Sequence, residues 1–283
     1  MVRILNEVDA ASLDAFLAIH RDTSMFLRSN SRRAGLEYRG GTYDAVYVGV
    51  FRDNSLKGVA AHGSNGLVQL QAPDKDDAGV LARAVVDASA RNVAGLIGPI
   101  DQVRTARTAL NLDDAVPTVD GDERLYALDL VNLRVPDALT SGRVVCRPPG
   151  PTERDTLVAW RMAYDLEVLG AKDTEEQRTR SAAVLDGQIA DDRAWIALND
   201  DAPVSLAAFN AVLPDIVQLG GIYTPPELRG RGYAKAAVAA SLLVARERGV
   251  TRAVLFTPNP NAERTYGAIG FERCGDYGLV LFR

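Results

Sequence analysis

The chain has 283 residues, of which 47% are hydrophobic and 24% are charged, and its formal net charge is −5. This length predicts roughly two domains, and the acidic balance argues against nucleic acid as a partner. No apolar run is long enough to span a bilayer, and residues 1–9 lack a signal-peptide pattern. We therefore expect a cytoplasmic protein without membrane attachment.

Cysteine and histidine are scarce. The two cysteines, Cys146 and Cys274, are far apart in sequence, and we expect both to be buried thiols in a reducing compartment. Neither His20 nor His62 stands at a spacing from them that is typical of a metal site. We therefore expect no bound metal.

The first half of the chain predicts helix, helix, three strands, helix, strand, helix and strand. The expected helices are 10–19, 24–33, 76–90 and 100–110, and the expected strands are 45–51, 56–62, 67–71, 94–98 and 124–130. Helix 76–90 has an acidic start, which suits the positive N-terminal end of a helix dipole.

A segment of Pro, Gly and polar residues follows, and it predicts a domain boundary. We expect a first domain at 1–135, a linker at 136–142 and a second domain at 143–283. The second half repeats the element order of the first. Its expected helices are 153–169, 174–188, 233–248 and 261–269, and its expected strands are 143–147, 194–198, 204–212, 216–223, 253–257, 271–274 and 277–282.

A turn rich in Gly and Arg joins the last of the three consecutive strands of the second half to a long helix. Gly230 and Gly232 permit backbone conformations that side chains would block, and they let a ligand come close. The loop N–H groups and the helix start carry a partial positive charge. Full charges are added by Arg229, Arg231 and Lys235. This combination predicts a phosphate or pyrophosphate site.

The equivalent segment of the first half is different. Residues 71–78 follow the third strand but lack glycine and are acidic, so they would repel a phosphate. We therefore expect the first half to be a degenerate copy without a cofactor, and the second half to hold the site.

Residues 143–283 resemble the GNAT superfamily of N-acetyltransferases. The family signature is Arg or Gln, two residues, Gly, one residue, then Gly or Ala, and it is matched here by Arg229, Gly232 and Ala234 between a strand and a helix. A second family pattern on the following helix is matched by Asn259, Ala262, Tyr266, Gly270 and Phe271. The repeated order is similar to that of tandem GNAT proteins whose N-terminal copy has lost the cofactor. The resemblance implies an α/β fold (α+β mixed) of two tandem GNAT-like domains, each with a central, mostly antiparallel mixed sheet flanked by helices.

The resemblance also implies acetyl-CoA as co-substrate. Its pyrophosphate would lie on the N–H groups of residues 229–235, and its pantetheine arm would pair like an extra strand with residues 222–224. This requires strands 216–223 and 253–257 to splay apart. Gly220 and Gly221 would supply a bulge that helps them do so, or would simply pack under a helix. The expected cofactor-binding residues are Ile222, Tyr223, Thr224, Arg229, Gly230, Arg231, Gly232, Tyr233, Ala234, Lys235, Asn259, Asn261 and Ala262.

Transfer of the acetyl group needs an acid for the thiolate, a donor for the oxyanion and a base for the amine. The resemblance makes Tyr266 the general acid, with a core or surface aromatic as the alternative. A backbone N–H in residues 219–222 would serve the oxyanion. Some family members place a Glu base where this chain has Gln218, which cannot accept a proton and is instead expected to contact the substrate. Glu167 is a candidate base or amine anchor, against a solvated helix face, and a base reached through water is equally compatible.

The acceptor itself is not determined by the sequence. We expect a primary amine on a small molecule or a peptide, and a monomer or homodimer. Arg28, Arg32 and Arg33 form a basic cluster that is either a solvated helix face or a contact for an acidic part of the substrate or the CoA 3′-phosphate. The alternative function is an acyl-CoA-binding sensor or interaction module that kept the cofactor cleft.

Overall fold

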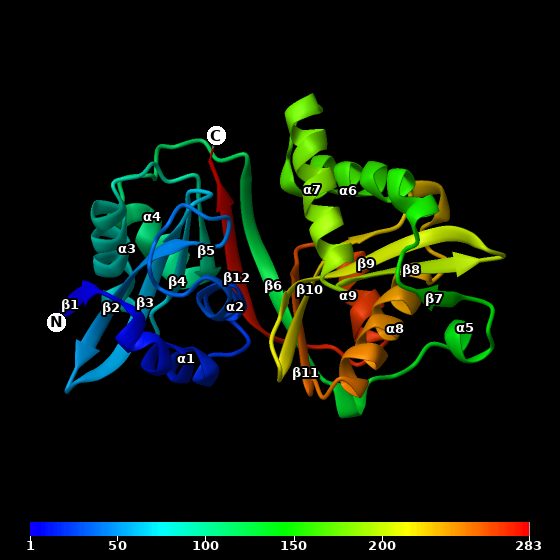
Figure 1. Ribbon diagram of the computed structural model, residues 1–283, viewed down its shortest axis with the longest axis horizontal. Helices are drawn as coiled ribbons and strands as arrows, with labels where there is room; N and C mark the ends of the chain where they lie inside the picture. The colour runs from blue at the N-terminus through cyan, green and yellow to red at the C-terminus, as the bar shows by residue number, and fades with distance from the viewer. Residues whose placement is uncertain (283) are drawn as a thin grey trace. The chain divides into compact units, whose positions relative to one another are not determined.

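The computed structural model describes residues 1–282, apart from the side chain of Lys75 (Figure 1). By internal contacts the chain divides into two compact units. The first unit is Met1–Leu125 together with the residues from Gly275 onward, and the second unit is Tyr126–Cys274.

The first unit has a mixed sheet in the strand order β1-β2-β3-β4-β5-β12. All neighbouring strands are antiparallel except β4 and β5, which are parallel. Its elements are β1 (Val2–Ile4), α1 (Ala10–Ile19), α2 (Met25–Ala34), β2 (Ala45–Arg52), β3 (Ser55–Gly63), β4 (Leu67–Gln71), α3 (Lys75–Ser89), β5 (Gly95–Pro99), α4 (Ile100–Ala109) and most of β6 (Val119–Asp129).

The second unit has a mixed sheet in the strand order β6-β11-β10-β9-β8-β7. Strands β7 to β10 are antiparallel neighbours, whereas β10 and β11 are parallel. Its elements after β6 are α5 (Asp137–Thr140), β7 (Val145–Arg147), α6 (Arg154–Leu169), α7 (Glu175–Ala190), β8 (Ala194–Asn199), β9 (Ala202–Val212), β10 (Ile216–Tyr223), α8 (Tyr233–Glu247), β11 (Arg252–Thr257), α9 (Pro260–Gly267) and the start of β12 (Glu272–Leu281).

The predicted element order is therefore present twice, once as α1 to β6 and once as α6 to β12. In both units the helix pairs cover opposite faces of the sheet. In the second unit, α8 packs on one face through Ala237, Val238 and Leu242. Leu157 of α6 and Leu185 of α7 pack on the other. In the first unit, α3 and α4 share one apolar cluster with the sheet and α1 and α2 share another. The predicted fold class is confirmed.

The units divide the chain differently from the predicted ranges 1–135, 136–142 and 143–283. Strand β6 is a single strand whose last residues, from Tyr126, belong to the second unit. Residues 136–142 are not a bare linker, because they include α5, and Ala138 and Leu139 pack against the core of the second unit. The end of the chain belongs to the first unit, because residues 277–281 pair with β5. The last two predicted strands are one continuous strand, β12.

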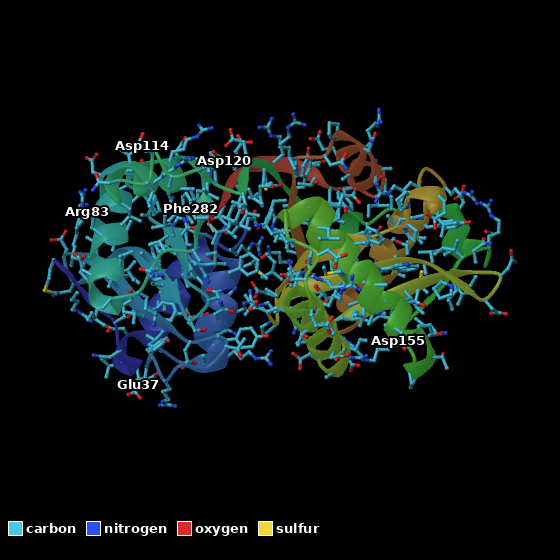
Figure 2. All side chains as sticks on the ribbon, turned by 90° about the horizontal axis from the view of Figure 1, so that it is seen from above. Glu37, Arg83, Asp114, Asp120, Asp155 and Phe282 are labelled. Atoms are coloured by element: carbon cyan, nitrogen blue, oxygen red, sulfur yellow. The ribbon has the colours of Figure 1, made fainter. Side chains whose placement is uncertain are left out.

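Charged side chains account for much of the surface of both units. Figure 2 labels five of them, Glu37, Arg83, Asp114, Asp120 and Asp155, and all five are exposed. Within the described residues, no helix is both long and apolar enough to cross a membrane.

Candidate active site

Strand β10 is irregular where the sequence predicts a bulge. Its register with β9 shifts between Gln218 and Leu219, and again between Gly220 and Tyr223. Gly221 has a φ of +64°, a left-handed conformation that glycine adopts without strain. In the described part of the chain, the pairing of β10 with β11 ends at Gln218↔Val254, although both strands continue. The end of β10 therefore presents backbone to the β11 side without a ladder partner.

The two glycines of the bulge also make room for polar side chains. A Cβ on Gly220 would stand 1.9 Å from the amide nitrogen of Asn210, which comes from β9. A Cβ on Gly221 would stand 2.9 Å from Nη1 of Arg161, which comes from α6. From the sequence, Gly220 and Gly221 were expected either to form a bulge or to pack under a helix. In the structure they lie in the bulge, and Gly221 also packs against Arg161 of α6.

The Gly/Arg turn leads from β10 into α8. A short 3₁₀ turn at Pro226–Leu228 precedes it, and Gly230 and Gly232 have φ values of +79° and +83°. Gly232 is the N-cap of α8 and provides no side-chain cap, and the first turn carries no acidic residue. The first N–H groups of a helix have no intrahelical acceptor, so this end is left open to an anion.

The three cations of the turn differ in their contacts. The guanidinium of Arg229 forms two hydrogen bonds to the carboxylate of Glu167, of 2.7 and 3.0 Å, and its Nε donates to the carbonyl of Thr224 at 2.9 Å. The pairing with Glu167 raises the pKa of Arg229. Arg231 and Lys235 form no ion pair with any described residue. Two of the three predicted cations are thus unpaired at the loop.

Glu167 lies near the end of α6 and is half-exposed. The structure places it on an exposed part of α6 beside the Gly/Arg turn. Its two oxygens already accept from Arg229, so the pair links α6 to the turn.

Tyr266 is buried in the core on which α8 packs, with its ring 6.0 Å from that of Phe271 in an edge-on arrangement. Burial, and to a smaller extent Tyr164 of α6, raises the pKa of its hydroxyl. The hydroxyl therefore keeps its proton at neutral pH, as a proton donor must.

The other predicted residues of this helix lie at its start. Asn259 is the N-cap of α9 and accepts a hydrogen bond from the N–H of Asn261 at 2.9 Å. Asn261 is exposed and its side chain accepts from Arg264. Ala262 packs against the core. Gln218 is 3% exposed and lies in β10 between Ala211 of β9 and Val254 of β11.

A buried ion pair on α6 was missed by the sequence analysis. Arg161 donates to Asp165 from Nη2 at 2.8 Å and from Nε at 3.3 Å. Asp165 also accepts from Ser181 at 2.5 Å and from Gln177 at 3.3 Å, both on α7. The i, i+4 spacing of Arg161 and Asp165 was visible, but such pairs are usually solvent-exposed, and burial could not be read from the spacing.

The matching strand–turn–helix of the first unit is closed. The N–H of Ala72, just after β4, donates to Oε1 of Gln102 at 2.7 Å. Asp74 caps α3 by accepting from the N–H of Asp76 at 3.1 Å. Asp77, in the same turn, pairs with Arg52 at 2.7 Å. Side chains of this unit therefore already accept from two N–H groups of this segment.

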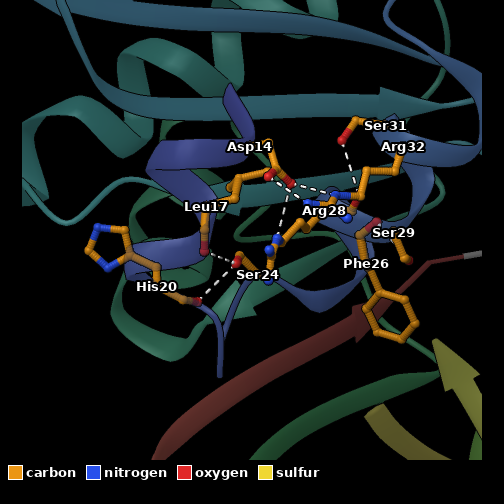
Figure 3. Close-up of polar contacts among 9 residues, drawn as sticks. All are labelled: Asp14, Leu17, His20, Ser24, Phe26, Arg28, Ser29, Ser31 and Arg32. Carbon is orange, nitrogen blue, oxygen red and sulfur yellow. Dashed lines mark hydrogen bonds and ion pairs between the residues drawn. The ribbon is translucent and has the colours of Figure 1, made fainter. Parts of the chain in front are cut away.

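The basic cluster on α2 is tied down within the first unit. Arg28 and Arg32 both donate to Asp14 of α1, at 3.0 and 2.7 Å (Figure 3). Arg28 is 6% exposed, whereas Arg32 and Arg33 are exposed, so only part of the cluster lies on a solvated helix face. Hydrogen bonding from Arg32, with help from Arg28, lowers the pKa of Asp14. Arg33 instead lies over the ring of Tyr43.

The cysteines differ from the prediction in one respect. Cys146 is partly buried, and burial raises the pKa of its thiol to about 12. Cys274 is exposed, in the part of β12 that comes before its pairing with β5. Among the described residues, no group of three or more His, Cys, Asp or Glu side chains is arranged to hold a metal ion.

Comparisons with known proteins agree with this arrangement. The model of the acetyltransferase (GNAT) family matches residues 156–271. This range contains the bulge of β10, the Gly/Arg turn and Tyr266. A search of curated proteins finds no match to the chain.

Several solved structures share the fold over most of the chain. A GCN5-related N-acetyltransferase from Sphaerobacter thermophilus has a TM-score of 0.60 at 15% identity, covering 99% of this chain and 94% of its own. One from Kribbella flavida has a TM-score of 0.59 at 17% identity, covering 93% and 94%. A tandem GNAT protein from the clavulanic acid biosynthesis pathway has a TM-score of 0.57 at 15% identity, covering 99% and 97%.

The solved structures establish the fold, and the family model identifies the domain within it. The second unit thus carries a domain that matches the acetyltransferase (GNAT) family, and the fold of the whole chain is shared with solved tandem and GCN5-related acetyltransferase structures.

Proposed function

We propose that the protein is an acetyl-CoA-dependent N-acetyltransferase that acts on a primary amine. The observation that carries this proposal is the junction of a bulged strand with an uncapped helix. The backbone of β10 after Gln218 lacks a partner in β11, and α8 begins at Gly232 without a side-chain cap. An amide-containing arm that ends in a pyrophosphate fits both features.

The residues of the turn suit the charged end of acetyl-CoA. The positive φ values of Gly230 and Gly232 turn the backbone without a Cβ in the way. Arg231 and Lys235 supply charge, and the N–H groups of Tyr233, Ala234 and Lys235 supply donors. Ile222, Tyr223 and Thr224 would hold the pantetheine amides, and Asn259, Asn261 and Ala262 would border them from α9.

In the proposed reaction the neutral amine nitrogen attacks the thioester carbonyl. A C–N bond forms, the C–S bond breaks, and one amine proton is lost while the thiolate gains a proton. Tyr266 donates to the departing sulfur, since its hydroxyl stays protonated. Backbone N–H groups at the bulge, in residues 219–222, stabilise the negative charge on the oxygen.

The amine proton leaves through ordered water in this proposal. Gln218 occupies the position of a family base and has no proton affinity, so it would contact the substrate. Glu167 already accepts two hydrogen bonds from Arg229. Its role is to hold the loop, and the acceptor amine is deprotonated by solvent.

The first unit binds no cofactor in this proposal. Gln102 and Asp74 satisfy the N–H groups that a pantetheine arm and a pyrophosphate would need. Calorimetry of the full chain with acetyl-CoA is then expected to give one site per chain, and two sites would contradict the proposal.

The alternative, a sensor that binds acyl-CoA without turnover, is favoured by Gln218 alone. Calorimetry followed by a thiol-release assay across primary amines separates the two. We expect binding and amine-dependent thiol release. Binding without release on any amine supports the sensor, and a lack of binding contradicts both functions.

A further inference from the structure

We infer that Arg161 binds a carboxylate of the acceptor, so that the preferred substrates are amino acids or related amino-carboxylates. This inference deepens the proposed function and rests on it for the position of the acyl group. It is carried by a buried guanidinium with one nitrogen still without a partner, at the bulge of β10.

The orientation of Arg161 is fixed from one side. Its side chain is 10% exposed and that of Asp165 is 3% exposed. Nε and Nη2 face Asp165, which is itself held by Ser181 and Gln177 of α7. Such a supported pair keeps a guanidinium in one conformation, as sites for planar anions require.

The remaining nitrogen, Nη1, faces β10. It makes no hydrogen bond to any described residue, and it stands 2.9 Å from the position that a Cβ on Gly221 would take. Nη1 is not among the fully buried polar atoms that lack a partner, so it is accessible to solvent or to a ligand. A ligand oxygen would supply the acceptor that is missing.

A second polar group lies beside the neighbouring glycine of the bulge. The side-chain amide of Asn210 fills the space beside Gly220 and makes no hydrogen bond to another described residue. The guanidinium also lies over the ring of Tyr164, 5.0 Å from its centroid. Tyr164 in turn acts electrostatically on Tyr266. Arg161 is thus linked through one aromatic ring to the proposed acid.

The face of β10 on which Arg161 lies indicates that the bound carboxylate belongs to the acceptor and not to the acyl donor. Val217 and Leu219 of β10 face the core under α8, the layer to which Tyr266 also belongs. Arg161 approaches from α6, on the other face. Because the thiol leaves on the side of Tyr266, the amine arrives from the side of Arg161. A cationic diamine is disfavoured there by like charge.

The test uses the full chain and measures binding of N-acetyl amino acids against their carboxamides by calorimetry. A charge-assisted hydrogen bond to a buried guanidinium is expected to favour the carboxylate by about 10- to 100-fold. Arg161→Lys keeps the positive charge but lacks the planar guanidinium with its several N–H donors. This variant is expected to remove most of the preference for the carboxylate over the carboxamide. Arg154→Lys is the matched control on the same helix, because Arg154 forms an exposed bidentate pair with Asp186.

A second variant guards against misfolding. Removal of Arg161 alone leaves Asp165 buried without its partner, so Arg161→Met is combined with Asp165→Leu, an apolar pair that a core tolerates. This variant is expected to bind the acid and the carboxamide equally. Equal binding by the unaltered protein overturns the inference, as does a preference that survives in both Arg161 variants.

The assay also separates this inference from the proposed function. Acetyl-CoA binding and thiol release are measured on the same samples, and their failure concerns the proposed function alone. If the carboxylate preference instead follows the acyl group, with succinyl-CoA bound better than acetyl-CoA in an Arg161-dependent way, the acceptor assignment is overturned.

Discussion

The two copies of the strand–turn–helix differ most at the first turn of the helix. In the first unit Asp74 caps α3, and Asp76 and Asp77 follow it. In the second unit the cap position of α8 is Gly232, in a left-handed conformation, and no acid follows. Both helices leave the same N–H groups to satisfy. In α3 the carboxylate of Asp74 accepts from one of them, the N–H of Asp76, and in α8 no side chain caps the first turn.

The strands that precede these helices differ in the same way. Strand β4 pairs with β3 without a register shift from Val59↔Gln71 to His62↔Val68, and a Cβ on Gly98 of β5 would stand 2.8 Å from the carbonyl of Leu70. Strand β10 has two register shifts against β9. A fold that keeps its core in both copies can therefore lose or keep a site through a few residues at one strand end.

The difference between the two helix starts is tested most directly by placing an Asp at the N-cap position of α8. Gly232→Asp places at the start of α8 the residue that caps α3. The carboxylate would compete with the pyrophosphate for the same N–H groups, and we expect acetyl-CoA affinity to fall by about 100-fold or more. Calorimetry measures the affinity, and circular dichroism checks the helix.

The control for this variant is at the other end of the same helix. Gly249 also has a positive φ, of +89°, and like Gly232 it has no close neighbour at its Cβ position. Gly249→Asp adds the same charge and similar strain, and is expected to leave acetyl-CoA affinity unchanged. Equal loss in both variants would mean that strain in α8, and not the anion site, accounts for the effect.

A second change removes the proposed acid and leaves its packing intact. Tyr266→Phe keeps the edge-on contact with Phe271, so the fold and acetyl-CoA affinity should be preserved. Loss of the proton donor is expected to lower kcat by about 100-fold. Steady-state thiol release at saturating acetyl-CoA measures it. Full turnover in this variant would assign Tyr266 to the core only.

Much of this contrast was visible in the sequence, because it depends on local residues. Glycine, proline and charge patterns act within a few positions, so the turn after β10 and its acidic counterpart after β4 were predicted. The sequence did not predict that the last strand pairs with β5 of the first unit, because the partner of β12 is determined by packing of distant segments. Arg161 was missed because the burial of its pair with Asp165, and its approach to Gly221, arise only in the folded unit.

The units also differ in how they hold a buried carboxylate. Asp165 accepts hydrogen bonds from three side chains, whereas Glu123 on β6 is 6% exposed and accepts none from another described residue. Burial raises the pKa of Glu123 to about 7. The folded state therefore binds its proton more tightly than the unfolded state, and the stability that this supplies is lost as the pH rises towards 7.

Glu123→Gln should remove this dependence. At pH 7.5 we expect the variant to be more stable than the unaltered protein by roughly 1–3 kcal/mol, and the difference should shrink towards pH 5. Urea midpoints at the two pH values measure it. Glu37→Gln, at an exposed position, is the control and should show no such trend. A difference that grows towards low pH would have the opposite sign and would contradict the assignment.

The smallest expected effect concerns the ion pair that links α6 to the Gly/Arg turn. Glu167 and Arg229 are both close to half-exposed, and exposed ion pairs contribute about 0–1 kcal/mol. Glu167→Gln should therefore change kcat by less than about 5-fold. Because it releases Arg229 towards the anion site, acetyl-CoA affinity should rise slightly or stay constant. Calorimetry and thiol release on the same sample separate the two quantities. If turnover instead fell by about 100-fold while affinity was retained, Glu167 would be the base, and the amine proton would leave through this carboxylate and not through water.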